Sequence, residues 1–239
     1  MSKITRTEGL VLSSRPFRES SKIAVIFTRK SGRIDVLAHG ARRPGSKFGA
    51  SLEPGTELSL IYYERENKNL LTLSSADIIV SHQKLRESRD SLKLLYRVLG
   101  FLSHISHPGE SNSGLYNLTV SLLNAMDKGN SIGYLFEYYL LHTASTVGYH
   151  PGIDERCVIC GKKTEGKFSI VSGGFLCSEH SKEDSTLYLT KQERIMLYEL
   201  SEFSVENLSK KYNSITPLIS KLLRQYAVYH LHADPKLVL

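Results

Sequence analysis

Short apolar runs alternate with turn-forming residues over the first 80 positions, a pattern typical of successive β-strands. It predicts strands over residues 7–14, 22–28, 33–39, 56–64 and 70–79. A tight hairpin turn is expected at Lys30-Ser31-Gly32, whereas the connection after the third strand is long and rich in Gly and Pro. Five strands with one long third connection favour an OB-fold barrel, although an SH3-like barrel would produce a similar pattern.

Beyond residue 80 the apolar positions recur with the period of an amphipathic α-helix. Leucine-rich stripes predict helices over 84–106, 112–127 and 132–147. Farther along, Thr190 and Glu193 form a capping-box pattern, and Thr216-Pro217 marks the start of a last helix. Such stripes are typical of helices that bury one face in a core. We therefore expect an α+β protein, with an OB-fold domain in residues 1–80 and a helical domain in residues 81–239.

The net charge of +7 is concentrated near the N-terminus. Residues 1–50 hold 11 Lys and Arg but only three Asp and Glu, which gives +8, while the remainder of the chain carries −1. A solvated face normally mixes both signs, so a field of one sign indicates a polyanionic partner.

An OB barrel binds nucleic acid on strands two and three and on the loops joining strands 1–2 and 4–5. Basic residues fall in the first of these loops and at the ends of strands two and three, and the loop over residues 40–55 supplies three more. Lys and Arg neutralise phosphates without reading the base sequence, and a ring such as Phe17 or Phe48 can stack on an unpaired base. Any one of these charges alone could be an ordinary solvated residue. The candidate DNA-binding residues are Arg15, Phe17, Arg18, Lys22, Arg29, Arg33, Arg42, Arg43 and Lys47.

All three cysteines lie in one segment, CVICGKKTEGKFSIVSGGFLCSEH, residues 157–180. Cys157-x-x-Cys160 and Cys177-x-x-His180 form two knuckles separated by 16 residues, a spacing typical of zinc sites. The intervening KFSIVSGGFL predicts a hairpin that returns the second knuckle to the first. Four ligands would leave no position for a substrate water, so the sequence predicts one structural zinc ion, in a segment of about 154–183.

Two alternatives remain open for this segment. A CxxC pair can be a redox motif, although no βαβ pattern surrounds this one. The fourth ligand could also be His150, Asp154 or Glu179 in place of His180.

An odd number of cysteines and the lack of a signal-peptide pattern favour a reducing cytosol over a disulfide framework. No apolar run is long enough for a membrane span.

Little in the sequence supports catalysis. It lacks the HExxH, GxSxG and GxxxxGK[ST] motifs and a GxGxxG after a strand. A zinc deaminase would need an HxE motif, which is also missing. We therefore do not expect an enzyme.

Two stretches of the chain resemble the RecO family of bacterial DNA repair proteins. TEGLVLSSRPFRESSKIAVIFTRKSGRIDVLAHGARRPGSKF is similar to the N-terminal barrel of that family, and VGYHPGIDERCVICGK with SGGFLCSEH is similar to its zinc segment. The resemblance covers essentially the whole chain in the same order. His180 departs from the commoner family pattern, which has cysteine at the fourth position, and some members lack the zinc ligands.

The resemblance implies a recombination mediator of the bacterial cytoplasm, associated with the nucleoid. Members of the family bind single- and double-stranded DNA and anneal complementary strands. With RecR, they help to load RecA onto DNA coated by single-strand-binding protein. Zinc would then stabilise the helical domain. The alternatives are another zinc-containing nucleic-acid-binding module, such as a transcription or ribosome-associated factor, and an unrecognised enzyme.

Overall fold

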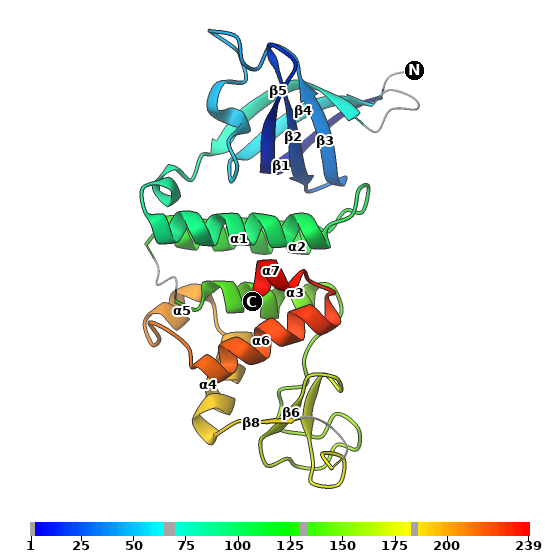
Figure 1. Cartoon of the computed structure of the whole chain (residues 1–239), viewed down its shortest axis with the longest axis vertical. Coiled ribbons are helices and arrows are strands. Elements are labelled where there is room, and N and C mark those ends of the chain that lie inside the picture. Colours follow the sequence, from blue (N-terminus) through cyan, green and yellow to red (C-terminus); the bar gives the residue numbers. More distant parts are fainter. Residues whose placement is uncertain (1–2, 65–69, 130–132, 183–185) are drawn as a thin grey trace. The chain divides into compact units, whose positions relative to one another are not determined.

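The computed structural model describes residues 3–64, 70–129, 133–182 and 186–239. These residues form two compact units, Met1–Asp127 and Lys128–Leu239. The first contains a β-barrel followed by two helices, and the second contains the remaining helices and a small three-stranded sheet (Figure 1). Among the described residues, no helix is both long enough and apolar enough to span a membrane.

The barrel of the first unit is closed, with the strand order β1-β2-β3-β5-β4. Its parallel pair is β3 with β5, and its other pairs are antiparallel. This is the arrangement of an OB fold, so the fold prediction is confirmed over the SH3-like alternative. The strands are β1 (Lys3–Phe17), β2 (Ser21–Thr28), β3 (Gly32–Ala38), β4 (Glu57–Glu64) and β5 (Leu70–Val80).

Strand β1 is longer than predicted because it pairs with two neighbours. Residues 9–17 pair with β2, and residues 3–10 pair with β4. The register shifts between Val11 and Ser13, and such an irregularity bends a strand and increases its twist. The bend lets β1 pair with β2 along one half and with β4 along the other half, which closes the barrel.

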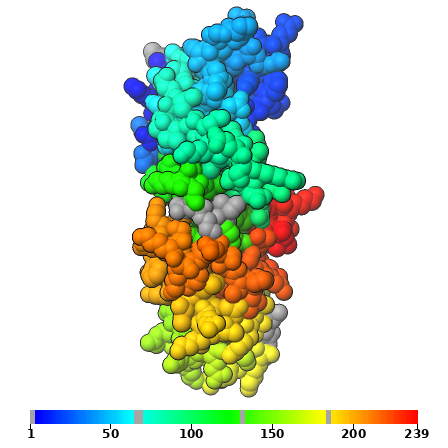
Figure 2. All heavy atoms as spheres, turned by 90° about the vertical axis from the view of Figure 1, so that its left-hand side faces the viewer, coloured from blue at the N-terminus to red at the C-terminus, as the bar shows by residue number. Residues whose placement is uncertain are grey.

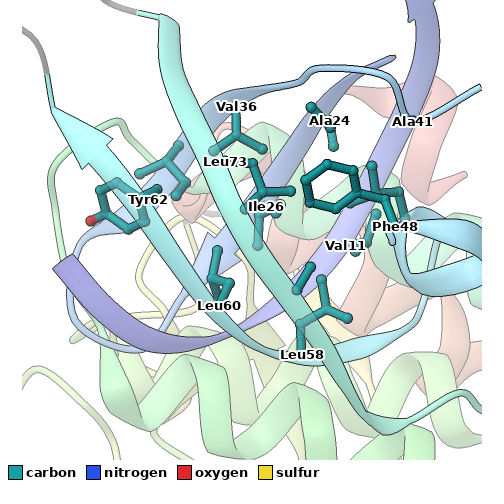
Figure 3. Close-up of a cluster of buried hydrophobic side chains, with 14 residues drawn as sticks. Val11, Ala24, Ile26, Val36, Ala41, Phe48, Leu58, Leu60, Tyr62 and Leu73 are labelled. Atoms are coloured by element: carbon teal, nitrogen blue, oxygen red, sulfur yellow. The ribbon is translucent and has the colours of Figure 1, made fainter. Parts of the chain in front are cut away.

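Alternating side chains of the strands fill the barrel interior. In β3, Ile34, Val36 and Ala38 are buried, whereas Asp35 between them is exposed. Figure 3 shows residues from several strands, including Val11, Ile26, Val36, Leu60 and Leu73, pointing into this interior.

The long connection between β3 and β4 contains a short 3₁₀-helix, η1 (Gly49–Leu52). Its Leu52 is completely buried, as is nearly all of Phe48 just before it. The hairpin between β2 and β3 also forms as predicted. Gly32 there has a φ of +61°, and a Cβ at this position would collide with the backbone of Glu110.

The predicted helix over residues 84–106 is divided into two elements. A 3₁₀-helix, η2 (Gln83–Arg86), precedes α1 (Arg89–Ile105). The division occurs because the side chain of Ser88 accepts a hydrogen bond from the N–H of Ser91 and caps a new helix there. Next comes α2 (Ser113–Asp127), close to the predicted 112–127. Both helices belong to the same compact unit as the barrel.

The second unit contains five helices among its described residues: α3 (Leu135–Thr146), α4 (Lys191–Glu202), α5 (Val205–Ser209), α6 (Pro217–His230) and α7 (Pro235–Val238). The predicted capping box at the start of α4 is confirmed, as is the Thr216 cap of α6. The predicted start of the third helix, residue 132, lies outside the described residues.

A small sheet with the order β7-β6-β8 completes the second unit. Strands β6 (Lys167–Ser169) and β7 (Gly174–Leu176) form the hairpin predicted between the two knuckles. Strand β8 (Thr186–Tyr188) adds to β6 and had not been predicted. The last residue assigned to the zinc segment, 183, lies outside the described residues.

Candidate nucleic-acid interface and metal centre

Seven of the nine candidate DNA-binding residues lie at one end of the barrel. They come from the end of β1, the turn after it, the start of β2 and the connection that follows β3. The strand register explains the grouping, because Pro16 pairs with Lys22, and Lys22 pairs with Ala38. We call this group the basic end of the barrel. It consists of Arg15, Phe17, Arg18, Lys22, Arg42, Arg43 and Lys47.

Hydrogen bonds hold the two loops of the basic end together. The backbone N–H of Arg42 donates to the carbonyl oxygen of Ser20 over 2.9 Å. Its guanidinium Nη1 also donates to the carbonyl oxygens of Arg18 and Glu19, over 3.3 and 3.2 Å. The position of Arg42 is therefore fixed, and sequence analysis could not anticipate this contact between two separate basic segments.

Other side chains of the basic end remain available to a ligand. Arg15 and Arg43 are exposed, and their side chains make no hydrogen bond or ion pair with any residue that the structure describes. Phe17 is half-buried, with the guanidinium of Arg18 stacked 5.3 Å from its ring centroid. These groups can meet phosphate oxygens and one base face without a large rearrangement.

Each of the two lysines of the basic end has one polar partner among the described residues. Lys22 Nζ lies 3.4 Å from Glu53 Oε1, an ion pair whose carboxylate is 49% exposed. Lys47 Nζ donates to the carbonyl oxygen of Ser74 over 2.6 Å. An exposed pair of this kind contributes little to stability, so Lys22 can exchange its carboxylate partner for a phosphate at small cost.

Arg29 and Arg33 lie at the opposite end of strands β2 and β3, where their side chains contact other parts of the unit. Arg29 donates to Glu8 and to Asn117, each over 2.7 Å. Arg33 Nη1 donates to the carbonyl oxygen of Ser103 in α1 over 2.6 Å. These contacts leave the two arginines fewer free N–H groups than Arg15 or Arg43 has.

One suggested stacking residue is corrected by the structure. Phe48 is only 2% exposed, and its ring packs in the barrel interior near Ala24 and Ala41 (Figure 3). Its aromatic ring therefore belongs to the core and cannot stack on a base. The loop between β4 and β5, which also binds nucleic acid in many OB folds, is formed by residues 65–69 and lies outside the described residues.

The second candidate site is formed by the two knuckles in the other unit. After Cys160, Gly161 has a φ of +73°, and its N–H donates to the carbonyl oxygen of Cys157 over 2.8 Å. In the second knuckle, the N–H of Ser181 donates to the carbonyl oxygen of Cys177 over 3.0 Å. These tight turns present two side chains from each knuckle to one point.

The four predicted ligand atoms lie within 4.8 Å of one another. Sγ of Cys160 is 3.8 Å from Sγ of Cys177, and Nδ1 of His180 is 3.4 Å from Sγ of Cys177 and 3.6 Å from Sγ of Cys157. A tetrahedral zinc ion with ordinary bond lengths requires sulfur atoms about 3.8 Å apart and sulfur–nitrogen distances of about 3.5 Å. The spacing of this group therefore fits zinc.

His180 supplies the fourth possible ligand atom of this group. Two of the alternatives have other partners: Nδ1 of His150 lies 2.8 Å from Oγ of Ser145, and Glu179 forms an ion pair with Lys162. Because both knuckles converge, the arrangement also favours a metal site over a redox pair.

At Cys157 and Cys177 the local backbone favours the thiolate, which is the form of cysteine that binds metal. Burial alone would raise the pKa of the Cys157 thiol, but backbone N–H groups outweigh it and lower that pKa to about 6. The N–H of His180 is the main cause that lowers the pKa of Cys177. In the protein alone, the nearby thiolates raise the pKa of His180.

The candidate metal centre, formed by Cys157, Cys160, Cys177 and His180, is connected to the helices of its unit through the β6–β7 hairpin. Phe168 and Phe175 meet edge to face at 5.3 Å, and Phe168 also contacts the ring of Tyr226 in α6. His230 Nε2, at the end of α6, donates to the carbonyl oxygen of Ile170 over 2.7 Å. A metal that fixes this hairpin would therefore also support the packing of α6.

Comparisons with known proteins agree with this arrangement. Residues 1–82 match the family model described as Recombination protein O N terminal, and residues 86–237 match Recombination protein O C terminal. The chain is 31% identical to the DNA repair protein RecO of Exiguobacterium sibiricum, across 93% of this chain and 88% of that protein. It is 33% identical to the DNA repair protein RecO of Rubrobacter xylanophilus, across 73% of this chain and 70% of that protein. The chain therefore belongs to the RecO family of DNA repair proteins.

Proposed function

We propose that this protein is a non-enzymatic recombination mediator that binds single- and double-stranded DNA through the basic end of its barrel. It anneals complementary strands and, together with RecR, assists the loading of RecA onto DNA coated by single-strand-binding protein. It acts in the bacterial cytoplasm, in association with the nucleoid. Its membership of the RecO family and the chemistry of the basic end support this proposal.

The basic end is the observation that carries the proposal. Its six cations are accompanied by two exposed acidic residues on the same segments, Glu19 and Glu53. An excess of positive charge on adjoining loops attracts a polyanion over long distances and releases counterions when phosphates bind. Because these contacts go to the backbone, binding should depend little on base sequence.

Backbone contacts of this kind suit strand annealing. A protein that holds a strand by its phosphates leaves most base edges free to pair with a second strand. Phe17 offers one ring, which can hold a single base by stacking without selecting its identity. A site that gripped several bases would instead compete with pairing.

We also propose that the metal centre holds one Zn²⁺ ion with Cys157, Cys160, Cys177 and His180 as ligands. The four protein ligands would fill its coordination shell, so the ion would supply structural support and no reaction chemistry. Its effect would be on the folding of the second unit, because binding energy at a structural zinc site acts as folding energy.

The proposed function is tested by annealing two complementary oligonucleotides, each coated with single-strand-binding protein and labelled for energy transfer. The wild-type protein should accelerate annealing, and an Arg15→Ala/Arg43→Ala variant should be slower by about tenfold or more, if each arginine makes a charge-assisted contact. A Lys210→Ala/Lys221→Ala variant, which removes two exposed lysines from the second unit, serves as the matched control. Failure of the wild-type protein to accelerate annealing would contradict the proposal.

A further inference from the structure

A row of cations follows the exposed face of α1. Arg89, Lys93 and Arg97 are spaced four residues apart, so successive members lie about 6 Å from one another along the helix axis. We call these three residues the α1 row. The face of α1 on the opposite side is apolar and buried, formed by Leu94, Leu95, Val98, Leu99, Phe101 and Leu102. Arg89 and Lys93 are exposed and Arg97 is half-buried, so the row runs along the side of α1 away from this apolar face.

Two members of the α1 row have no charge partner among the residues that the structure describes. Arg89 and Lys93 are exposed, and neither forms a hydrogen bond or ion pair with any part of the chain that the structure describes. Asp90 lies at the edge of the row and is its closest acidic residue in sequence. Figure 2 shows side chains of this turquoise-green stretch standing out on the molecular surface. Charge pairing with the described residues therefore does not explain these two cations.

An exposed aromatic ring accompanies the row. Tyr96 is 54% exposed and lies one turn from Lys93 on the same face of α1. Evenly spaced cations beside an exposed ring fit a nucleic-acid strand, which offers phosphates at regular intervals and bases that stack. An acidic protein surface would use the cations but would give the ring no such role.

The α1 row is separate from the basic end of the barrel. Helix α1 contacts the opposite end of strands β2 and β3, where Arg33 donates to Ser103 and Pro108 bridges to Gly32. Lys22 of the basic end lies at the start of β2, whereas the β2–β3 hairpin lies at the other end of that strand. The first unit therefore has two basic surfaces at different ends of the same strands.

We propose that the α1 row is a second strand-binding surface, so that one barrel unit holds two nucleic-acid strands at once. This inference rests on the proposed function and deepens it, because annealing requires two polyanions to approach each other. Cations on two surfaces of one unit reduce the repulsion between the strands. Contacts to the phosphates of each strand keep the bases available for pairing.

The test uses two oligothymidylates that cannot pair, one carrying a donor dye and the other an acceptor dye. The full chain should bring them together and produce energy transfer at protein concentrations where both strands are bound. Three variants are compared with the wild type: Arg89→Ala/Lys93→Ala, Tyr96→Leu and Tyr96→Phe. Alanine is well tolerated at exposed helix positions, and equal melting temperatures verify that the variants fold.

The Arg89→Ala/Lys93→Ala variant should lose at least about tenfold in bridging affinity, while its affinity for one strand at the basic end stays within about threefold of wild type. Tyr96→Leu should weaken bridging, and Tyr96→Phe should restore it because the ring is retained. The Lys210→Ala/Lys221→Ala control should bridge normally.

If Arg89→Ala/Lys93→Ala bridges the strands at the wild-type level, the proposal of a second surface is overturned. That result is also the one expected if the barrels of two protein molecules in a dimer each hold one strand. Absence of bridging in the wild type would also overturn it. The proposed function fails by a different result, which is unchanged single-strand binding and annealing in Arg15→Ala/Arg43→Ala. The two failures are therefore distinguishable.

Discussion

Arg42 Nη1 donates a hydrogen bond to the carbonyl oxygen of Arg18 over 3.3 Å. Arg18 has a φ of +52°, a left-handed conformation that is unfavourable for a residue with a side chain. The contact thus supports a strained turn and at the same time places two arginines side by side. It makes the loop after β3 and the turn after β1 parts of one surface.

This contact predicts that a positive charge at position 42 is not sufficient by itself for full DNA affinity. In Arg42→Lys the charge is kept, but the planar fork that reaches the Arg18 and Glu19 carbonyl oxygens is lost. We expect DNA affinity to fall by about threefold to tenfold, with faster amide hydrogen exchange in residues 39–47. Arg43→Lys is the matched control, because Arg43 has no such contact among the described residues, and it should bind almost as wild type. Equal binding by both variants would contradict this role of Arg42.

The contact also shows what sequence analysis could and could not predict. The strands and the hairpin at Gly32 follow from period-two patterns and turn residues, which are local signals. The meeting of Arg42 with Arg18 depends on the path of a long loop, which no local pattern specifies. Phe48 was misjudged for the same reason, because only the folded loop shows that its ring enters the barrel.

The convergence of the two knuckles could be predicted more fully than the basic end, because the spacing of their residues in the sequence is a local signal. Two knuckles of fixed length and a hairpin between them constrain the four ligand atoms almost completely. The division of the helix at Ser88 was missed because apolar residues continue with helical spacing across it. Likewise, Arg29 and Arg33 look like surface cations in sequence, although each contacts a residue of α1 or α2.

The metal centre predicts a large effect of a single ligand substitution. Cys160→Ser should lose bound zinc and lower the melting temperature by about 10 °C or more, because structural zinc affinity contributes directly to folding. The salt dependence of DNA binding should not change. Ser178→Ala, which alters an exposed residue between two ligands, is the control. Elemental analysis that finds no zinc in the native protein, or a Cys160→Ser variant as stable as wild type, would disprove this assignment.

A buried ion pair between α3 and α6 predicts a second effect on stability. Glu137, whose side chain is 5% exposed, accepts hydrogen bonds from Arg224 Nε over 2.8 Å and from Ser220 Oγ over 2.7 Å. Its Oε1 also lies 2.6 Å from Arg224 Nη2 in an ion pair. Arg224→Ala should destabilise the protein by about 3 kcal/mol, because it leaves a buried carboxylate without its charged partner. Lys221→Ala, an exposed change on the same helix, should change the free energy of unfolding by less than about 0.5 kcal/mol. Urea denaturation measures both, and similar values for the two variants would refute the role of the pair.

His82 predicts how stability responds to acid. The side chain is 1% exposed, and neither ring nitrogen has a hydrogen-bond partner among the described residues. Burial, opposed by the nearby Asp127 carboxylate and assisted by Arg86, lowers the pKa of His82 below its ordinary value of 6.5. The unfolded chain therefore takes up a proton at higher pH than the folded protein does. His82 therefore has no effect on the pH dependence of stability well above pH 6.5, and it lowers the free energy of unfolding as the pH falls below that value.

The variant that tests this effect is His82→Asn, which removes the titrating ring. Asparagine tolerates the left-handed φ of +48° at this position. Between pH 6.5 and 5, the free energy of unfolding should decline less steeply than in wild type, by up to about 1 kcal/mol per pH unit. His142, whose pKa is also lowered by burial, should maintain part of the slope. His107→Asn, at an exposed position, should leave the slope as it is. A wild-type slope in His82→Asn would contradict this prediction.

We propose that DNA binds by its phosphates to the basic end of the barrel. The most direct measurement is fluorescence anisotropy of a labelled single strand across a salt series, for wild type, Arg15→Ala/Arg43→Ala and the Lys210→Ala/Lys221→Ala control. Lys210 and Lys221 are exposed and suit the control. Lys211 is not used, because it forms an ion pair with Glu199 and its removal could change stability. Loss of two phosphate contacts should flatten the slope of log K against log salt by about 1.4, with weaker binding to every base sequence. An unchanged slope for Arg15→Ala/Arg43→Ala, or a larger effect from the control, would contradict the account.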